Sequence, residues 1–331
     1  MTTERPHDGG GFEHQPVMAR EVLELLAPIP GGTVVDATVG GGGHARLLLE
    51  SRPDVAVLGI DRDADAVAAA RARLAEFGDR VQVVHGGFEN VAEIVRSHAT
   101  AWRSGPRSEG KIMAILFDLG TSSPQLDRPE RGFSYWGEAP LDMRMDAAQE
   151  LTAETVVNTY SEERLAQIIA ENGEEKYARQ IAARIVAKRP LHTTADLVEA
   201  VKEAIPARAR RRGGHPARRT FQAIRMEVNR ELPNLAEGLD ESVHLVAPGG
   251  RILVLAYHSL EDRLVKERFA AWAGSRDESP PGLPVEPEKT GLVRRITRRA
   301  LRPSAEEVAA NPRARSARLR AIEKLPTTAG S

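Results

Sequence analysis

The chain has 331 residues, of which 41% are hydrophobic and 28% charged, and its formal net charge is −1 at pH 7. This length suits one large globular domain or two smaller ones. Because cysteine is absent, an iron–sulfur cluster, pyrimidine C5 methylation through a thiol and a zinc nucleobase deaminase are all excluded. The sequence shows no membrane-spanning apolar run and no signal-peptide core, so we expect a cytoplasmic protein without a membrane partner.

A glycine-rich loop follows the first predicted strand, which ends at Thr33 to Val35. Four consecutive glycines occupy 40–43, and a helix is predicted from Arg46. Glycines let the backbone pass close to a ligand, and the helix N-terminus points free N–H groups into the same space. The spacing Gly40-x-Gly42-x-x-Ala45 loosely fits the dinucleotide fingerprint, which keeps NAD open as a ligand.

The second and third predicted strands add two candidate contacts for an adenosine. The apolar run 55–60 ends in Asp61, a position from which a carboxylate hydrogen-bonds ribose hydroxyls. NAD and S-adenosylmethionine (SAM) both contain this ribose, so Asp61 does not distinguish them. The third strand, 81–84, leads to Phe88, which either stacks on the adenine or packs in the core.

A fourth predicted strand, 111–117, is followed by Asp118 and by small, turn-forming residues up to Asp127. An acidic residue at the carboxyl end of a buried parallel strand lies where open α/β sheets bind their ligands. A turn-forming aspartate at a strand exit is the simpler alternative. We take Asp118, Ser122 and Ser123 from this segment as candidate catalytic residues.

Helical patterns replace strand patterns after this segment. Apolar residues recur at helical spacing in 174–188, Thr193 to Asp196 is a capping box, and 219–230 is predicted as a further helix. No strand candidate appears from Asp127 to about Asp240.

The strand pattern returns at 248–257, followed by His258. Ser259 is expected to cap the next helix together with Asp262. His258 either lines the target pocket, as a fourth catalytic candidate, or serves the entry to this helix. We therefore predict an α/β fold whose doubly wound sheet is built from 1–127 and 236–331, with an inserted all-α substrate domain at 128–235.

Arginines cluster in two segments. In the loop 207–219, Gly and Pro mark a flexible segment, and clustered arginine in such a loop suits phosphate contacts. Nine more arginines lie between Arg294 and Arg320, where solvated surface is an equally good interpretation. The predicted RNA contacts in the loop are Arg210, Arg211, Arg212 and Arg219.

The segment after Asp127 holds further candidates for RNA contact. Phe133, Tyr135 and Trp136 either hold a flipped base or pack the insertion onto the main domain. Asp142 and Asp146 are either catalytic or pair with arginines such as Arg144, which is itself a candidate RNA contact.

Together these segments resemble the MraW family of bacterial 16S ribosomal RNA (cytosine-N4)-methyltransferases. The resemblance runs from His14 to Ser316, nearly the whole chain. Its most specific blocks are Asp36–His44, Gly59–Asp63, Asp118–Gln125, Arg131–Ser134, Pro140–Asp146, Arg219–Arg225 and His258–Arg263.

The resemblance implies a Rossmann-like, SAM-dependent methyltransferase whose partner is 16S rRNA in the small ribosomal subunit. The implied reaction is methylation of the exocyclic N4 amine of a decoding-centre cytidine, cytidine 1402 of that RNA. The SAM contacts implied by the resemblance are Gly42, Gly43, His44, Asp61, Phe88, Asp118 and Gln125. Asp36 and Gly40, in the same glycine-rich segment, are added as further candidate SAM contacts. No metal-ligand cluster is predicted, and the oligomeric state is left open, a homodimer included.

Three alternatives to this function stay open at the level of sequence. A SAM-dependent amino-methyltransferase acting on another nucleic acid uses the same residues. An NAD-dependent dehydrogenase requires a hydride-transfer site in the second domain, where this chain is instead helical and arginine-rich. A non-catalytic RNA-binding or ribosome-assembly factor does not require both the glycine loop and the two strand-end acids.

Overall fold

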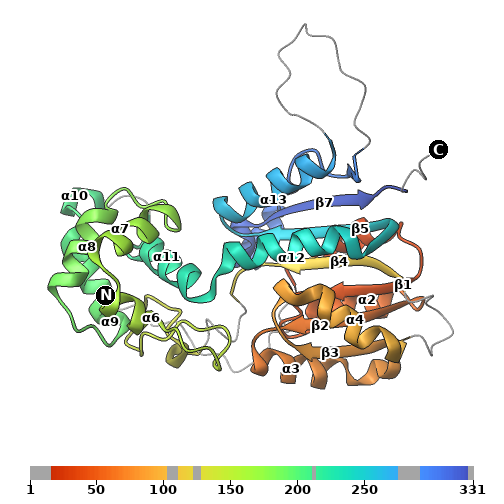
Figure 1. Ribbon diagram of the computed structural model, residues 1–331, viewed down its shortest axis with the longest axis horizontal. Coiled ribbons are helices and arrows are strands. Elements are labelled where there is room, and N and C mark those ends of the chain that lie inside the picture. Colours follow the sequence, from red (N-terminus) through yellow and green to blue (C-terminus); the bar gives the residue numbers. More distant parts are fainter. Residues whose placement is uncertain (1–15, 103–110, 122–127, 211–213, 275–290, 327–331) are drawn as a thin grey trace, which may run out of the picture.

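The computed structural model describes residues 16–102, 111–121, 128–210, 214–274 and 291–326. Its centre is a sheet with the strand order β3-β2-β1-β4-β5-β7-β6 (Figure 1). The first five strands pair in parallel, whereas β7 runs antiparallel to both β5 and β6. The strands are β1 (Gly32–Asp36), β2 (Val55–Asp61), β3 (Val81–His85), β4 (Ile112–Asp118), β5 (Val246–Ala256), β6 (Val293–Arg295) and β7 (Arg318–Lys324).

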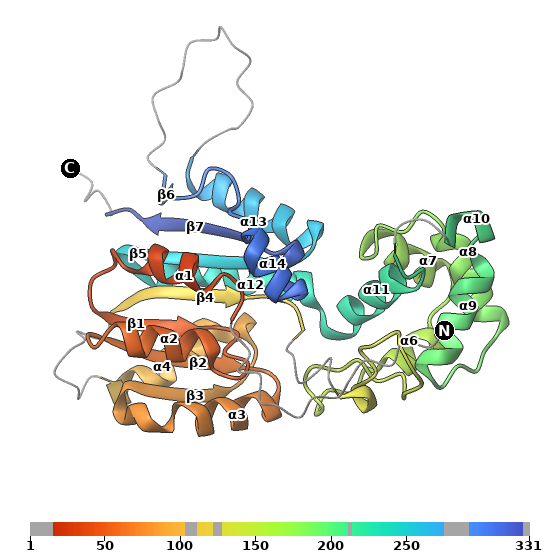
Figure 2. The same ribbon diagram turned by 180° about the vertical axis from the view of Figure 1, so that it is seen from behind.

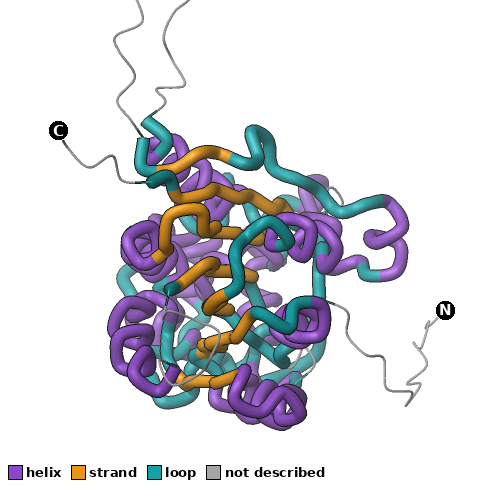
Figure 3. Tube along the Cα trace, turned by 90° about the vertical axis from the view of Figure 1, so that its right-hand side faces the viewer, coloured by secondary structure: helices purple, strands orange, loops and turns teal. Residues whose placement is uncertain are grey.

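Helices cover both faces of this sheet, as Figures 2 and 3 show. One apolar cluster joins the sheet to α1 (Ala19–Leu26), α2 (Gly43–Ser51) and α3 (Ala64–Leu74). A second cluster, on the opposite face, holds residues of α4 (Val91–Trp102), α12 (Glu231–Leu245) and α13 (Ser259–Trp272). Strands buried between two helical layers need apolar side chains on both faces, and β1 is accordingly buried at every position.

A separate helical unit follows β4 in the chain and lies beside the carboxyl ends of the parallel strands (Figure 1). Its own apolar cluster runs from Leu141 to Val228. The helices are α6 (Ala153–Thr159), α7 (Glu162–Glu171), α8 (Ala178–Ala187), α9 (Thr194–Ala204), α10 (Ala207–Arg210) and α11 (Arg218–Asn229). The remaining helix, α14 (Ala305–Ala310), precedes β7.

The predicted α/β doubly wound sheet with a helical insertion after the fourth strand is confirmed. Within the described part of 128–235, strand-like pairing is limited to a single bridge between Pro140 and Thr193. The domain limits at 127 and 235 stay predictions; α12 begins before the second of them and packs Leu235, Leu239 and Val243 against the sheet. None of the described helices combines the length and apolar character needed to cross a membrane.

The structure confirms one predicted helix cap and corrects another. The capping box at Thr193 and Asp196 is confirmed at the start of α9. The cap of α13 is wrong by one residue: His258 is the N-cap, and Glu261, not Asp262, completes the box. Asp262 instead forms ion pairs with Arg318 and Arg320 of β7, a strand that the sequence pattern did not reveal.

Candidate active site

A cleft of about 1290 Å³ lies between the carboxyl ends of the parallel strands and the helical unit. Asp61 and Asp118, at the ends of β2 and β4, line it from the sheet side. Gly173, Glu174 and Phe221 line it from the helical unit. Ligands of open α/β sheets bind at this edge, so the cleft is the candidate active site.

The glycine loop presents backbone to this cleft. Gly40, Gly41 and Gly43 line it, and a Cβ added at Gly41 would meet no atom within 4 Å. Gly42 differs, because a Cβ there would lie 3.2 Å from Leu74 of α3 and its φ is +79°. Gly42 therefore allows the loop to turn against α3, and its predicted contact with SAM stays a prediction.

Asp61 holds this loop in shape. Its Oδ2 accepts a 2.8 Å hydrogen bond from the N–H of Gly40, and its Oδ1 accepts one of 2.9 Å from the N–H of Asp63. Burial raises the pKa of Asp61 above its ordinary value despite these two donors. The carboxylate thus links β2 to the glycine loop at the position predicted for ribose contact.

Phe88 packs in the core and also lines the cleft, while its stacking on an adenine stays a prediction. Its ring packs edge-on against Phe117 of β4, with a centroid distance of 5.6 Å and an interplanar angle of 82°. It also lines the cleft, where the guanidinium of Arg62 lies 5.7 Å from its centroid. Phe88 is therefore a partly buried aromatic wall of the cleft.

Asp118 lies at the centre of a polar cluster. The phenol of Tyr257 donates a 2.7 Å hydrogen bond to Oδ1 of Asp118, while Nε2 of His44 lies 3.4 Å from Oδ2. The N–H of Asp118 donates to Oγ1 of Thr38 over 2.6 Å. Main chain and side chain of Asp118 are thus both fixed at the cleft.

The two neighbours of this carboxylate have shifted pKa values. Burial by itself lowers the pKa of His44, but the adjacent Asp118 outweighs it, so this pKa lies above its ordinary value. Burial and the Asp118 carboxylate raise the pKa of Tyr257 well above 10.0. Tyr257 therefore keeps its proton and acts as a donor at neutral pH.

Asp36 does not reach the cleft. It is 3% exposed, at the end of β1, and lies behind the glycine loop beside His44. Burial, opposed by His44 and reinforced by Asp118, raises the pKa of Asp36 to about 7. The predicted contact of Asp36 with SAM has no support in this arrangement and stays a prediction.

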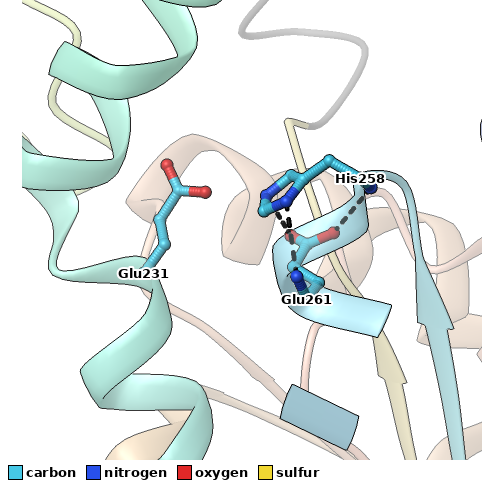
Figure 4. A group of neighbouring side chains, drawn as sticks. All are labelled: Glu231, His258 and Glu261. Carbon is cyan, nitrogen blue, oxygen red and sulfur yellow. Dashed lines mark hydrogen bonds and ion pairs between the residues drawn. The ribbon is translucent and has the colours of Figure 1, made fainter. Parts of the chain in front are cut away.

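His258 lines the cleft next to the carboxylates of Glu231 and Glu261 (Figure 4). Glu261 accepts the N–H groups of Tyr257 and His258 over 2.8 and 3.2 Å. Burial works to raise the pKa of Glu261, but His258 beside it outweighs burial and lowers it. Through these bonds Glu261 fixes the backbone of Tyr257 and His258 directly after the end of β5.

Ligand atoms of Glu231, His258 and Glu261 lie within 4.8 Å of one another, a grouping that the sequence did not predict. Both carboxylate oxygens of Glu231, however, accept 2.8 Å hydrogen bonds from the guanidinium of Arg225. The arginine balances the charge of Glu231, so we interpret these residues as an ion-pair network in the cleft wall.

The predicted RNA-contact residues take different places. Phe133 and Arg219 line the cleft, together with Tyr135, whereas Trp136 lies outside it and is 69% exposed. The guanidinium of Arg144 is held by Asp142 and by the carbonyls of Ala147 and Gln149. Arg144 thereby closes its own loop, and its contact with RNA stays a prediction.

Several predicted residues cannot be placed. Ser122, Ser123, Gln125, Arg211 and Arg212 lie outside the described residues. Arg210, at the end of α10, is exposed and is not among the residues that line the cleft. Asp146 accepts the N–H of Ala148 in a turn, which accounts for it structurally.

Functional candidates that sequence reasoning missed come from the later part of the chain. Tyr257 and Arg225 lie in the resemblance blocks or beside them, yet no spacing rule linked them to Asp118. Of the arginines between Arg294 and Arg320, a subset lines the cleft: Arg302, Arg313, Arg315 and Arg318. The antiparallel pairing of β7 with β5 brings this segment to the site.

The family comparison agrees with the geometry. The model of the MraW methylase family matches residues 11–325. A protein named ribosomal RNA small subunit methyltransferase H, from Symbiobacterium thermophilum, is 51% identical over 319 residues, covering 95% of this chain and 97% of its own. One of the same name from Mycolicibacterium gilvum is 50% identical over 323 residues, covering 94% of this chain and 83% of its own.

Among solved structures, an rRNA methylase from Streptococcus thermophilus matches with a TM-score of 0.41 and 12% identity, covering 91% of this chain and 92% of its own. At that TM-score the likeness adds nothing to the fold, which rests on the strand order itself. The sequence relatives decide between the cofactors that the glycine loop left open, and the NAD-dependent dehydrogenase is set aside. The chain belongs to the MraW methylase family and is a SAM-dependent methyltransferase.

Proposed function

We propose that this protein methylates the N4 amine of cytidine 1402 in 16S rRNA of the small ribosomal subunit. The names of its relatives support a small-subunit rRNA substrate. Arginines on both sides of the cleft, such as Arg218 and Arg315, suit a polyanion. The observation that carries the choice of an amine acceptor is the Asp118 carboxylate, fixed by Tyr257 and His44 at the cleft.

The residues of the cleft fit SAM. The exposed backbone of Gly40 and Gly41, the strand-end carboxylate of Asp61 and the ring of Phe88 all line one cavity, and in this proposal they hold the cofactor's amino-acid and adenosine parts. When bound, SAM supplies an electrophilic methyl group. Open space at Gly41 supports close approach of a ligand to the loop.

The chemical problem is the weak nucleophilicity of the cytosine amine, whose lone pair is delocalised into the ring. In this proposal the Asp118 carboxylate accepts a hydrogen bond from N4, which favours the pyramidal nitrogen that can attack a methyl group. Tyr257 fixes the rotamer of Asp118 through Oδ1. Most of the acceleration then comes from orientation of the amine, with removal of its proton at Asp118 as the second contribution.

The target base enters from the side of the helical unit in this proposal. Phe133 and Tyr135 line that side of the cleft, where an extruded base needs apolar walls. His258 and the Arg225–Glu231 pair also line the cleft and offer polar contacts to the edge of a base.

The test is incubation of the purified protein with methyl-labelled SAM and small ribosomal subunits from cells that lack this activity. The RNA is digested to nucleosides, and the labelled nucleoside is identified by mass spectrometry. We expect label on N4 of cytidine, and a fragment map should assign it to cytidine 1402. Label on another atom or nucleotide would leave the methyltransferase intact and overturn the target.

Asp118→Asn is the matched variant for the same assay. The amide keeps the size of the side chain but loses its charge, so transfer should fall by about a hundredfold or more, and SAM affinity is measured alongside because Asp118 is also an implied SAM contact. Full transfer by this variant would remove Asp118 from the chemistry. SAM binding without transfer by the unmodified protein, on any RNA offered, would favour an assembly factor.

A further inference from the structure

Trp136 is the most exposed of the large hydrophobic side chains in the described residues, at 69%. Aromatic residues make up only 4% of the chain, so the exposure of this tryptophan does not follow from a high aromatic content. Exposure of its indole costs free energy that burial elsewhere would avoid. Tryptophan, which combines a large apolar ring with a polar N–H, is enriched at interfaces.

The indole belongs to an ordered group of rings. The rings of Tyr135 and His215 are stacked, with centroids 4.6 Å apart and an interplanar angle of 11°. Trp136 lies 4.8 Å from His215 and 5.6 Å from Tyr135, measured between ring centroids. Phe221 of α11 packs edge-on against Tyr135 at 5.9 Å and anchors the group in the helical core.

The surroundings of these rings are polar and positive. Tyr135 lines the cleft, so the ring group continues the cleft wall outward. Arg218 and Arg219 start α11 directly after the His215 turn; both are exposed and both line the cleft. A partner that binds here meets an aromatic face next to guanidinium groups, which is the combination that single-stranded nucleic acid recognises.

His215 contributes a neutral ring to this surface. Its Nδ1 accepts the N–H of Ala217 over 3.3 Å, and burial, together with the nearby charge of Lys202, lowers the pKa of His215 below its ordinary value. The ring group therefore carries no charge of its own at neutral pH. The arginines are therefore expected to contact phosphates, and the uncharged rings are expected to stack on the flat face of a base.

We propose that Trp136, backed by His215 and Tyr135, is a stacking platform for an unpaired nucleobase that flanks the target nucleotide in the RNA. This inference rests on the proposed RNA substrate but concerns a second subsite, outside the cleft that receives the target base. It assigns the rings a share of RNA affinity and none of the SAM affinity.

The experiment measures binding of a fluorescently labelled, single-stranded 16S rRNA oligonucleotide centred on the target cytidine, by anisotropy and without SAM. Trp136→Ala should weaken binding by about 5- to 100-fold, because stacking of one base contributes on that scale. Trp136→Phe keeps a ring and should retain most of the affinity, whereas Trp136→Leu keeps apolar area without a π-face and should not. Leu292→Ala, at an exposed apolar residue of the sheet unit, is the control and should bind normally.

A scan of abasic nucleotides locates the partner base. One abasic position beside the target should weaken binding to the unmodified protein and leave binding to Trp136→Ala unchanged, since the stacked pair is already lost. Equal affinity of Trp136→Ala and the unmodified protein would overturn the platform, as would a Leu variant that binds as well as the Phe variant. An unmodified protein that does not bind the oligonucleotide would overturn it too.

The outcome is separable from that of the proposed function. Sensitivity to Trp136 in the binding assay, combined with label on an atom other than N4, would keep the platform and reject the target. Label on N4, combined with RNA binding that does not depend on Trp136, would keep the target and reject the platform.

Discussion

The phenol of Tyr257, directly after β5, donates a 2.7 Å hydrogen bond to the carboxylate of Asp118 at the end of the adjacent strand β4. Both side chains line the cleft, and burial beside this carboxylate keeps the phenol protonated. The bond leaves Tyr257 with one role, that of a donor, and it fixes the orientation of the group that we assign to the amine.

Tyr257→Phe tests this relationship. A hydrogen bond to a charged group contributes about 1.5–3 kcal/mol, so kcat should fall by about tenfold or more, while KM for SAM should change little. Steady-state kinetics of the two proteins provide the measurement. The same substitution in Asp118→Asn should have little further effect on kcat, and two independent, additive losses would argue against a shared role.

Asp61→Ala tests the ribose contact and the loop contact together. The substitution removes acceptors for the N–H groups of Gly40 and Asp63, so we expect SAM affinity to fall by about tenfold or more, and stability to fall by about 1–3 kcal/mol. Isothermal titration and urea unfolding measure the two effects. Asp61→Asn keeps the shape of the side chain and one of its two acceptor oxygens, so it should lose less stability than Asp61→Ala; unchanged SAM affinity in both variants would remove Asp61 from cofactor binding.

The buried carboxyl of Asp36 predicts a pH dependence of stability. Its pKa is about 7 in the folded protein, against 3.8 as the ordinary value. The unfolded chain therefore loses this proton first, so the stabilising contribution is complete below pH ~4 and is lost as pH rises to about 7. Asp36→Asn removes this dependence.

The measurement is the free energy of unfolding of the Asn variant minus that of the unmodified protein, from urea titrations. This difference should increase from pH 5 to pH 8, by at most about 3 kcal/mol. Because the neighbouring His44 titrates with Asp36, a smaller rise agrees with the prediction. A difference that stays flat or decreases over this interval would show that Asp36 is ionised in the folded protein.

Arg218→Glu tests the positive rim of the cleft. Because Arg218 is exposed and lines the cleft, the reversal should weaken binding to every RNA sequence alike. It should also reduce the slope of log affinity against log salt concentration by about 1 or more, with SAM affinity unchanged. Lys266→Glu, an exposed reversal on α13 away from the cleft lining, is the matched control. Equal salt slopes for the two variants would show that Arg218 is an ordinary solvated surface residue without a phosphate contact.

Much of this protein follows from its sequence. Parallel strands buried on both faces need continuous apolar runs, and such runs, each ending in a polar residue or a glycine turn, identified β1, β2, β4 and β5. The glycine loop, Asp61 and Asp118 were found for the same reason, since strand order brings strand ends to one edge of a sheet. A family resemblance carried on long local blocks identified the cofactor.

The tertiary structure decided what depends on contacts between distant segments. β7 escaped prediction although Arg318 to Ala321 alternate charged and apolar residues, because its arginines were assigned to an arginine cluster and not to one face of a strand; pairing with β5 makes it a half-buried strand. The separation of Asp36 from the cleft, the bond of Tyr257 to Asp118 and the exposure of Trp136 follow from three-dimensional packing. Sequence spacing shows the order of residues along one strand or helix. The burial, charge pairing and pKa of a side chain depend instead on which other elements the fold packs against that strand or helix.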